Sequence, residues 1–299
     1  MKILFIINPG SGRKEVNYTG EIQKFFEGSD HDIETFELPE HCNPEELKNK
    51  ISTSNANRVI AVGGDGTVKL VAECLLNSDT SIGIIPGGSA NGLAKELGIP
   101  VQLPDALKLV TQEETHPVHI TRVNDQLCIH LSDIGFNAFV VKKFEDEKTR
   151  GMWGYFRAAF KTLLDTPYME VTISTGSETV RRKAAMVVIA NGTRYGSGAV
   201  INPGGRIDDD VFEIIIVRKI SFSEIFKMMV SHRPYDTAKT EVFQSSEARI
   251  HSRKKVHFQV DGEYLGKIHS LNAILVPGAL KFVIPQDKKV APVSEHPAG

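Results

Sequence analysis

The first third of the chain alternates short apolar runs with segments of helical composition. Four runs have the composition of strands: Lys2 to Ile7, Asp32 to Leu38, Arg58 to Val62 and Ser81 to Ile85. The helix candidates between and after them are about Asn17 to Phe26, Pro44 to Ser52, Val68 to Asn77 and Asn91 to Leu97. Because strands that alternate with helices pair in parallel, this pattern predicts an α/β unit built on a parallel sheet.

From about Val118 the pattern changes to β-type runs separated by short turns. These runs are His119 to Asn124, Gln126 to Asp133, Met169 to Ser174, Ala185 to Ala190, Val211 to Val217, Val256 to Val260 and Ala273 to Val276. They predict an antiparallel sandwich or barrel. Two helical patterns, Met152 to Leu164 and Phe222 to Val230, interrupt them. Their apolar faces fit either core packing or the wall of a site for an apolar substrate.

The chain has 299 residues, about twice the usual length of one domain, which predicts two compact units. We place the first at residues 1–118 and the second at 119–279, and expect residues 286–299 to form a flexible tail. The 35 basic and 37 acidic residues give a net charge of -2, which excludes the electrostatic footprint of nucleic-acid binding. Three cysteines at wide spacings indicate neither a disulfide framework nor a zinc ribbon.

The sequence contains no segment with the length of a membrane anchor. The N-terminal run Ile3 to Ile7 is too short for a signal peptide, and the longest apolar stretch is Ala184 to Ala190. We therefore expect a cytoplasmic protein whose contact with a membrane surface is peripheral and transient, because no polybasic stretch holds it there. The oligomeric state stays open, with a homodimer as one arrangement.

The strongest chemical signal is a glycine loop, Gly63-Gly64-Asp65-Gly66-Thr67, which follows a predicted strand and precedes a predicted helix. It is the second of three such loops along the chain. Glycines let the backbone approach phosphate oxygens, and the free N–H groups and dipole of a helix start favour an anion. An aspartate repels phosphate unless a cation, water or a polar network lies between them. Its presence therefore predicts a nucleotide together with a metal ion. The alternative is a tight turn in which Asp65 is the N-cap of the helix.

Two further loops leave their strands in the same way. The first glycine loop is Asn8-Pro9-Gly10-Ser11-Gly12, and the third is Pro86-Gly87-Gly88-Ser89-Ala90-Asn91. In a parallel sheet all three loops gather at the carboxyl edge, where ligands bind. Residues 87–92 have the glycine spacing of a P-loop, but Leu93 stands where that motif requires lysine.

With these loops the sequence resembles the diacylglycerol kinase catalytic-domain superfamily, which includes bacterial lipid kinases, sphingosine kinases and ceramide kinases. The three loops resemble its N-P-x-S-G, G-G-D-G-T and Asn-containing loops. Residues 134–138 are similar to its G-F-x-A segment, 190–198 to its N-G-x-x-Y-G-G-G stretch, and 259–263 to its late D-G-E. The match runs in order from residue 3 to about 285.

The resemblance implies an ATP-dependent kinase with a Rossmann-like α/β N-terminal domain and an antiparallel β-sandwich C-terminal domain. A strand near residues 280–285 would return to the first domain. ATP would be the co-substrate, Mg²⁺ the cofactor, and a lipid alcohol such as diacylglycerol or a sphingoid-type lipid the acceptor. By motif position the contacts to ATP would be Asn8, Pro9, Gly10, Ser11, Gly12, Gly63, Gly64, Asp65, Gly66, Thr67 and Ser89.

The resemblance also implies two places for metal ions. Asp65 would lie in the network around the catalytic magnesium. Bacterial members carry a structural metal in the second domain, which here would use Asp209 with the carbonyls of Arg206 and Val211. The alternative for this acidic segment is an exposed turn.

Asp261-Gly262-Glu263 has two interpretations. An Asp-Gly pair after the alternating run Val256, Phe258, Val260 is a hairpin signal. By resemblance, a carboxylate here accepts the proton of the lipid hydroxyl as it attacks the γ-phosphate. Asp261 is our first candidate for the base and Glu263 the second, with Asp65 in support. A turn and a catalytic carboxylate are compatible.

Several residues depart from the family pattern. Lys69 and Leu70 replace Asn and Glu after the second loop, Gly92 replaces the Asp of bacterial members, and Leu38 stands where a threonine is expected. These departures leave a catalytically weak pseudokinase that binds lipid or nucleotide as an alternative. A second alternative is NAD kinase, which shares G-G-D-G-T; the first loop and the late D-G-E argue against it.

Overall fold

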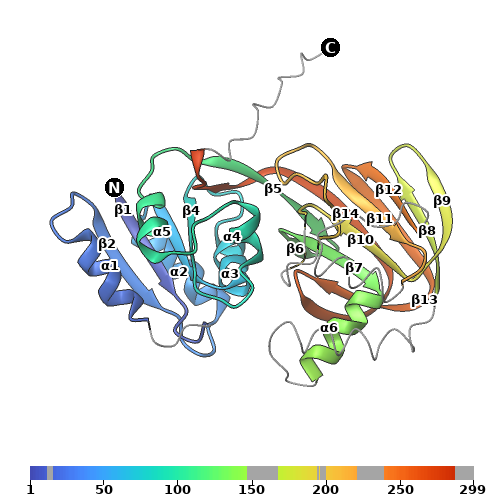
Figure 1. The fold of residues 1–299 in the computed structure, drawn as a ribbon, viewed down its shortest axis with the longest axis horizontal. Helices are drawn as coiled ribbons and strands as arrows, with labels where there is room; N and C mark the ends of the chain where they lie inside the picture. The colour runs from blue at the N-terminus through green and yellow to red at the C-terminus, as the bar shows by residue number, and fades with distance from the viewer. Residues whose placement is uncertain (12–15, 147–167, 194, 196–199, 221–238, 287–299) are drawn as a thin grey trace, which may run out of the picture. The chain divides into compact units, whose positions relative to one another are not determined.

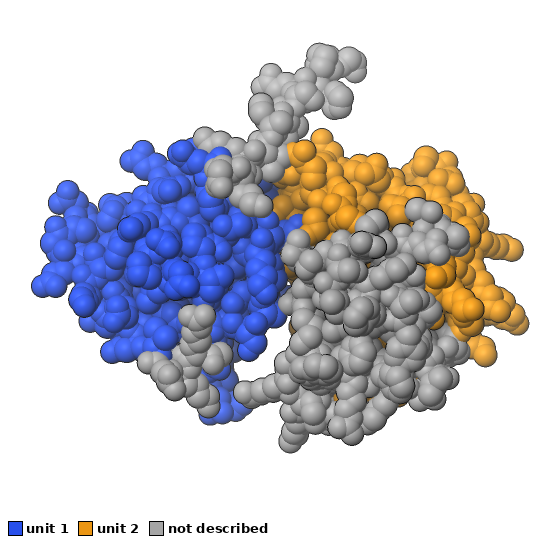
Figure 2. Space-filling view, in the orientation of Figure 1, with its two compact units in different colours: residues 1–118, 278–299 blue, residues 119–277 orange. Residues whose placement is uncertain are grey.

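The computed structural model describes residues 1–11, 16–146, 168–193, 195, 200–220 and 239–286. The chain divides into two compact units (Figure 2). Unit 1 comprises Met1–Val118 with Gly278–Gly299, and unit 2 comprises His119–Pro277. The two helical patterns of the second region, residues 287–299 of the predicted tail and Gly12 lie outside the described residues.

Unit 1 is built on a parallel sheet (Figure 1). Its strands are β1 (Lys2–Ile7), β2 (Asp32–Glu37), β3 (Arg58–Gly63) and β4 (Ser81–Pro86), in the order β2-β1-β3-β4. The end of β14 (Glu263–Phe282) pairs in parallel with β4 at Phe282 and Ile82. The next residue, Val283, donates its N–H to the Ile82 carbonyl at 2.9 Å. The four predicted strands are confirmed, and the last strand belongs to this sheet.

Of the helices in the described part of unit 1, two begin at an asparagine whose side chain accepts a free N–H group. The helices are α1 (Tyr18–Phe26), α2 (Pro44–Ser54), α3 (Asp65–Cys74), α4 (Gly92–Glu96) and α5 (Leu103–Leu109). Asn17 accepts the Gly20 N–H at 3.0 Å, and Asn43 accepts the Glu45 N–H at 3.0 Å, so both act as N-caps. The α2 cap and its following proline are as the sequence predicts.

Helices cover the parallel sheet of unit 1. Apolar side chains of β1, β3 and β4 pack against α1 and α5, with Phe5, Ile60 and Ile85 among them. The alternate positions Leu4 and Val59 are fully buried as well, which shows that the other face is also covered. α3 packs on β3 and α2 packs on α3. Strands buried on both faces explain why the sequence shows continuous apolar runs here.

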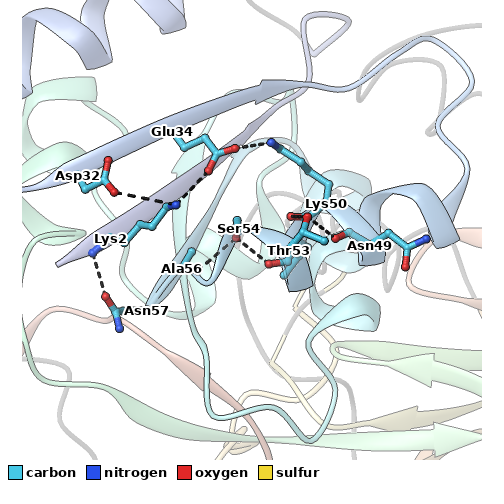
Figure 3. Close-up of polar contacts among 10 residues, drawn as sticks. Lys2, Asp32, Glu34, Asn49, Lys50, Thr53, Ser54, Ala56 and Asn57 are labelled. Carbon is cyan, nitrogen blue, oxygen red and sulfur yellow. Dashed lines mark hydrogen bonds and ion pairs between the residues drawn. The ribbon is translucent and has the colours of Figure 1, made fainter.

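Ion pairs hold the amino edge of this sheet, shown in Figure 3. Lys2 Nζ lies 4.0 Å from Asp32 Oδ2 and 3.7 Å from Glu34 Oε2, and Lys50 Nζ also contacts Glu34. The hydrogen bond from Lys50 holds the pKa of Glu34 below its ordinary value. The Lys2 N–H donates to Asn57 Oδ1 at 2.9 Å. Since the strands are parallel, the three glycine loops all leave the opposite, carboxyl edge.

Unit 2 consists mainly of antiparallel strands. They are β5 (His116–Val123, entering from unit 1), β6 (Gln126–Cys128), β7 (Leu131–Gly135), β8 (Met169–Thr175), β9 (Thr179–Ala184), β10 (Met186–Ala190), β11 (Phe212–Val217), β12 (Thr240–Ser245), β13 (Glu247–Val260) and most of β14. α6 (Phe136–Asp146) follows β7. No helix in the described part of the chain is long and apolar enough to span a membrane.

Strand β13 joins two branches of unit 2. Its first half, Ala248 to Ser252, pairs with β8, and its end, Phe258 to Val260, pairs with β7. Irregular register between His251 and Val256 separates the halves. One branch continues through β8 to β9, and the other through β7, β10 and β11 to β12. Apolar residues of both branches form one core, as in a β-sandwich.

Some predicted boundaries of unit 2 are wrong. The run Gln126 to Asp133 is two strands, because residues between them bond to a side chain rather than to a neighbouring strand. β9 and β12 are rich in polar residues and were not predicted, and α5 and α6 were also missed. β13 begins nine residues before the predicted Val256. The sequence does not reveal this first half as a strand, because it carries exposed charged residues.

Candidate functional site

Asn8 connects the first and second glycine loops of unit 1. Its Nδ2 donates to Thr67 Oγ1 at 3.0 Å, and its Oδ1 accepts the Gly10 N–H at 3.0 Å. The Asn8 N–H donates to the Val62 carbonyl at 2.9 Å, and Ser11 Oγ donates to the Asn8 carbonyl at 2.8 Å. The Asn8 side chain therefore folds the loop after β1 and ties it to the first turn of α3.

The second and third glycine loops approach each other at the level of the backbone. The Gly87 N–H donates to the Gly63 carbonyl at 2.8 Å. A Cβ on Gly88 would lie 2.5 Å from Gly64 Cα, closer than two carbon atoms can pack. A Cβ on Gly63 would lie 2.4 Å from Thr67 Oγ1. Only glycine permits this contact between the loops.

Asp65 joins the second loop to the helix that follows the third. Its Oδ2 accepts the Gly92 N–H at 2.9 Å and its Oδ1 accepts the Leu93 N–H at 3.0 Å. The residue at the N-cap position of α4, Asn91, has φ 51° and bonds back to Gly88 instead. Asp65 therefore caps α4. The alternative that it caps its own helix is wrong, since Gly64 holds that position in α3.

These contacts gather the predicted ATP residues of all three loops, apart from Gly12, at the carboxyl edge of the sheet. Pro9, Gly10, Gly66 and Ser89 are exposed there, whereas Thr67 is buried beneath them. The edge also contains the N-terminus of α3, whose dipole favours a negative charge. An exposed, glycine-rich backbone at a helix start can bind a phosphate group through its N–H groups.

The departures from the family pattern take defined places in unit 1. Leu38 is buried and its N–H donates to the Ile7 carbonyl at 2.7 Å. Lys69 and Leu70 are half-buried on α3. Gly92 is buried at the start of α4, where its N–H meets Asp65. A side chain larger than glycine at this position would have to fit beside that cap.

In unit 2, Asp261 and Gly262 form the predicted turn between β13 and β14. Val260 pairs with Glu263, and the two residues between them have φ 50° and 88°. Two successive positive φ values are typical of a type I′ hairpin turn. Glu263 is exposed at the first position of β14.

The Asp261 carboxylate binds the segment between β6 and β7. Its Oδ1 accepts the N–H groups of His130 and Leu131 at 2.9 and 3.2 Å, and its Oδ2 accepts the Ile129 N–H at 3.0 Å. The Asp261 N–H donates to the Leu131 carbonyl at 2.9 Å. Cys128 Sγ lies 3.8 Å from Oδ1. The Asp261 side chain thus holds the backbone of residues 129–131. Its Oδ2 receives one N–H among these bonds and can accept a further hydrogen bond.

Sequence reasoning missed a second carboxylate in unit 2, that of Asp133. It is fully buried on β7, and its Oδ2 accepts from Asn137 Nδ2 at 2.5 Å, Gln259 Nε2 at 2.6 Å and the Tyr195 hydroxyl at 3.1 Å. Burial raises its pKa to about 6, against the opposing effect of these hydrogen bonds. The available signal was weak, because residues 131–134, Leu-Ser-Asp-Ile, contain two polar residues.

The acidic segment before β11 contains the predicted ligands of a structural metal. Oδ1 of Asp209 is buried and has no hydrogen-bond partner among the described residues. Burial, followed by the nearby charges of Glu213 and Asp208, raises the Asp209 pKa to about 6. The Arg206 side chain pairs with Asp208 at 3.2 Å. The backbone carbonyls of Arg206 and Val211 are the companion ligands that the family resemblance implies. A buried carboxylate oxygen without a donor fits a bound cation.

Several known proteins are similar to this chain in sequence. An uncharacterized protein from Synechocystis is 29% identical over 218 residues, 70% of this chain and 50% of its own length, so the chain spans half of that relative. "Probable lipid kinase YegS-like" from Chromohalobacter salexigens is 28% identical over 251 residues, 80% of each chain. "Probable lipid kinase YegS" from Escherichia fergusonii is 28% identical over 238 residues, 77% of this chain and 78% of its own.

Solved structures share the fold. A putative diacylglycerol kinase from Bacillus anthracis matches with a TM-score of 0.78 and 21% identity, covering 96% of this chain and 98% of that one. An NAD kinase from Archaeoglobus fulgidus, solved in complex with ATP, matches with a TM-score of 0.57 and 14% identity over 96% and 95% of the two chains.

Models of two protein families match consecutive parts of the sequence. Residues 2–123 match the diacylglycerol kinase catalytic domain, and residues 132–284 match the YegS C-terminal NAD kinase beta sandwich-like domain. The three glycine loops lie in the first match, and Asp133, Asp209 and Asp261 lie in the second. The chain therefore belongs to the family that joins a diacylglycerol kinase catalytic domain to a YegS-type C-terminal domain.

Proposed function

We propose that this protein is a lipid kinase that transfers the γ-phosphoryl group of ATP to the hydroxyl of a lipid. The observation that carries the proposal is the single polar network of the three glycine loops in unit 1, held by Asn8, Asp65 and the contact of Gly63 with Gly87. The family match and the printed names of the relatives support a lipid acceptor, either a diacylglycerol or a sphingoid-type lipid.

ATP binds through the exposed face of these loops. Gly10 and Gly66 carry no side chain to block the phosphates, and Ser89 supplies a hydroxyl. The dipole of α3 stabilises phosphate charge. Each carboxylate oxygen of Asp65 accepts one N–H of α4. The remaining lone pairs of both oxygens can coordinate a divalent cation. Mg²⁺ bound with the nucleotide would neutralise charge on the phosphates.

Asp261 acts as the general base. Its Oδ2 accepts the proton of the lipid hydroxyl, the lipid oxygen forms a bond to the γ-phosphorus, and the bond to the ADP oxygen breaks. The three N–H donors hold the carboxylate in one orientation before the substrate arrives. Glu263, exposed on the same turn, is the second candidate. Asp209 holds a structural cation together with the carbonyls of Arg206 and Val211.

Incubation of the purified protein with radiolabelled ATP, magnesium and vesicles containing diacylglycerols, sphingoid bases or ceramides tests the proposal. We expect a labelled phospholipid. Asp261→Asn should lower turnover about 10²- to 10⁴-fold, while ATP still raises the melting temperature as it does for the wild type. Glu263→Gln is the matched variant on the same turn, and it should retain turnover if Asp261 is the base.

Two results would contradict the proposal. One is the absence of label from every lipid while an authentic lipid kinase succeeds in the same vesicles; ATP-induced stabilisation without turnover would then identify a nucleotide-binding pseudokinase. The other is formation of NADP from NAD, which would identify an NAD kinase. An unchanged rate for Asp261→Asn would remove Asp261 as the base and move the same test to Glu263.

A further inference from the structure

A buried chain of hydrogen bonds runs from Asp133 to the turn that carries the proposed base. Asp133 Oδ2 accepts from Gln259 Nε2 at 2.6 Å. Gln259 Oε1 accepts the N–H of Gly262 at 2.7 Å. Asp133 and Gln259 are opposite each other on β7 and β13, and both side chains are 0% exposed. The two ends of this hydrogen-bonded path, Asp133 and Gly262, are 129 residues apart in the sequence (262 minus 133).

The chemistry of the two end groups allows one orientation of the Gln259 amide. The Gly262 N–H can only donate, so it requires the amide oxygen. The ionised Asp133 carboxylate can only accept, so it requires the amide nitrogen. Reversal of the amide would place two donors together at one end and two acceptors together at the other. In a buried site such a mismatch leaves polar groups unsatisfied, which is strongly unfavourable.

Asp133 is itself held firmly by the elements around it. Asn137 on α6 and the Tyr195 hydroxyl donate to the oxygen that also receives Gln259. The neighbouring Ser132 donates its hydroxyl to the Gln259 carbonyl at 2.8 Å, a bond between the same two strands that is not part of the path from Asp133 through the Gln259 amide to Gly262. The turn at Asp261 and Gly262, with both φ angles positive, is thus held by the Gln259 amide as well as by the Asp261 carboxylate.

We propose that Asp133 is a positioning residue, which through the Gln259 amide fixes the backbone of the Asp261–Gly262 turn and so the direction of the catalytic carboxylate. This inference rests on the proposed function, because it assigns Asp133 and Gln259 to the same site. Neither residue touches the substrate. They keep Asp261 Oδ2 in the orientation that accepts the proton. This lowers the free-energy barrier of the chemical step and leaves the affinity for ATP unchanged.

The test removes the hydrogen-bonded path from Asp133 through Gln259 to Gly262, called the relay below. It then rebuilds this path with the donor and the acceptor between the two strands exchanged. Gln259→Met keeps the length of the side chain but has no amide, and Gln259→Glu places two carboxylates together. Both variants should lower kcat at least about tenfold while the KM for ATP stays within about twofold. The double variant Asp133→Asn with Gln259→Glu restores one donor and one acceptor between the strands. The Asn137 amide then has to turn its oxygen toward the new amide nitrogen at position 133, and the Tyr195 hydroxyl has to accept rather than donate. The double variant should therefore recover part of the lost kcat.

A second readout needs no lipid substrate. Exchange of the Gly262 amide hydrogen, followed by NMR in glycine-labelled protein, should accelerate in Gln259→Met and return toward the wild-type rate in the double variant. Ser132→Ala is the matched control, because it removes a buried hydrogen bond at the same pair of strands but leaves the relay intact. It should reduce stability and leave both kcat and the exchange of Gly262 close to the wild-type values.

The outcomes separate the inference from the proposed function. Wild-type turnover in Gln259→Met, or equal losses of kcat in Ser132→Ala and Gln259→Met, would overturn the positioning role. A double variant no better than Gln259→Glu would also overturn it. If the wild type phosphorylates no lipid, the proposed function fails, and the Gly262 exchange still decides whether the relay fixes the turn.

Discussion

The carboxylate of Asp65 accepts the backbone N–H of Gly92 at 2.9 Å, so a residue of the second glycine loop caps the helix that follows the third. Residues 27 positions apart are thereby locked together at the edge where ATP is proposed to bind. The position of the third loop depends on this aspartate even before any metal ion binds.

Loss of the Asp65 cap should affect both stability and nucleotide binding. Asp65→Ala leaves the N–H groups of Gly92 and Leu93 without their acceptor, and we expect a loss of about 1–2 kcal/mol in the free energy of unfolding. ATP-induced stabilisation should fall as well, because the third loop shifts. Urea unfolding with and without ATP measures both effects.

Asn43→Ala is the control for this prediction. It removes the N-cap of α2, where Asn43 accepts the Glu45 N–H, and should cost about 0.5–2 kcal/mol without changing the stabilisation by ATP. If Asp65→Ala retains full stabilisation by ATP, the arrangement of the third loop does not depend on this cap.

Gly88 and Gly66 should respond to alanine with opposite changes in stability. Gly88→Ala forces a Cβ to 2.5 Å from Gly64 Cα and should destabilise the protein by about 1–3 kcal/mol. A Cβ on Gly66 meets nothing within 4 Å, and alanine in α3 should raise stability by up to about 1 kcal/mol. Both variants should bind ATP more weakly, the first through displaced loops and the second because its methyl group occupies the space for phosphate.

Thermal unfolding and ATP titration of the two variants check this contrast. Normal ATP affinity in Gly66→Ala would show that the phosphates do not approach that residue. A stable Gly88→Ala variant would mean that the second and third loops can separate without cost, contrary to the contact between their backbones.

The cluster around Glu241 should give stability a dependence on acid pH. Arg182 donates to Glu241 at 2.8 and 2.6 Å, and Arg218 donates to it at 2.8 Å. The hydrogen bond from Arg182, which outweighs desolvation, lowers the Glu241 pKa to about 2. Because the folded-state pKa lies below the ordinary value of 4.5, the stabilisation is complete above that value and is lost as the pH falls toward 2.

Arg182→Met should therefore lower the free energy of unfolding at neutral pH, where the ion pair is fully formed in the wild type. It should also flatten the stability curve between about pH 5 and 2. Urea unfolding of wild type and variant across this range provides the measurement. Parallel curves for the two proteins would show that Glu241 is not the source of the acid dependence.

Asp209 should make the stability of the protein depend on divalent cations. Its buried Oδ1 lacks a hydrogen-bond donor among the described residues, and a cation would supply the missing partner. A chelator should lower the melting temperature of the wild type by several degrees, on the order of 1–2 kcal/mol of stability. Asp209→Asn should melt at the same temperature with and without the chelator.

Asp208→Asn is the matched variant for this test, because Asp208 already pairs with Arg206 and should remain sensitive to the chelator. A wild-type melting temperature that does not respond to chelator or added magnesium would leave Asp209 as a buried carboxyl group without a metal.

The sequence alone determined the elements whose pattern is local. β1, β3 and β4 follow from apolar runs because strands buried on both faces exclude most polar residues. β2 is only partly buried and follows from its pattern less clearly, and α2 follows from Asn43 and Pro44 at its start. The glycine loops and the turn at Asp261 were predictable because particular backbone conformations need glycine or aspartate at fixed positions. The strands β9 and β12, which are rich in polar residues, gave no comparable signal.

Tertiary structure decided the relationships between residues distant in the chain. Asp65 could be placed in a loop from the sequence, but that it caps α4 depends on the packing of two strands and two glycine loops. Asp133 and Gln259 are polar residues of two separate β-type runs, and only the pairing of β7 with β13 brings them together. Local pattern fixes which conformation a segment prefers, whereas the partner of a buried polar group is set by which strands become neighbours when the chain folds.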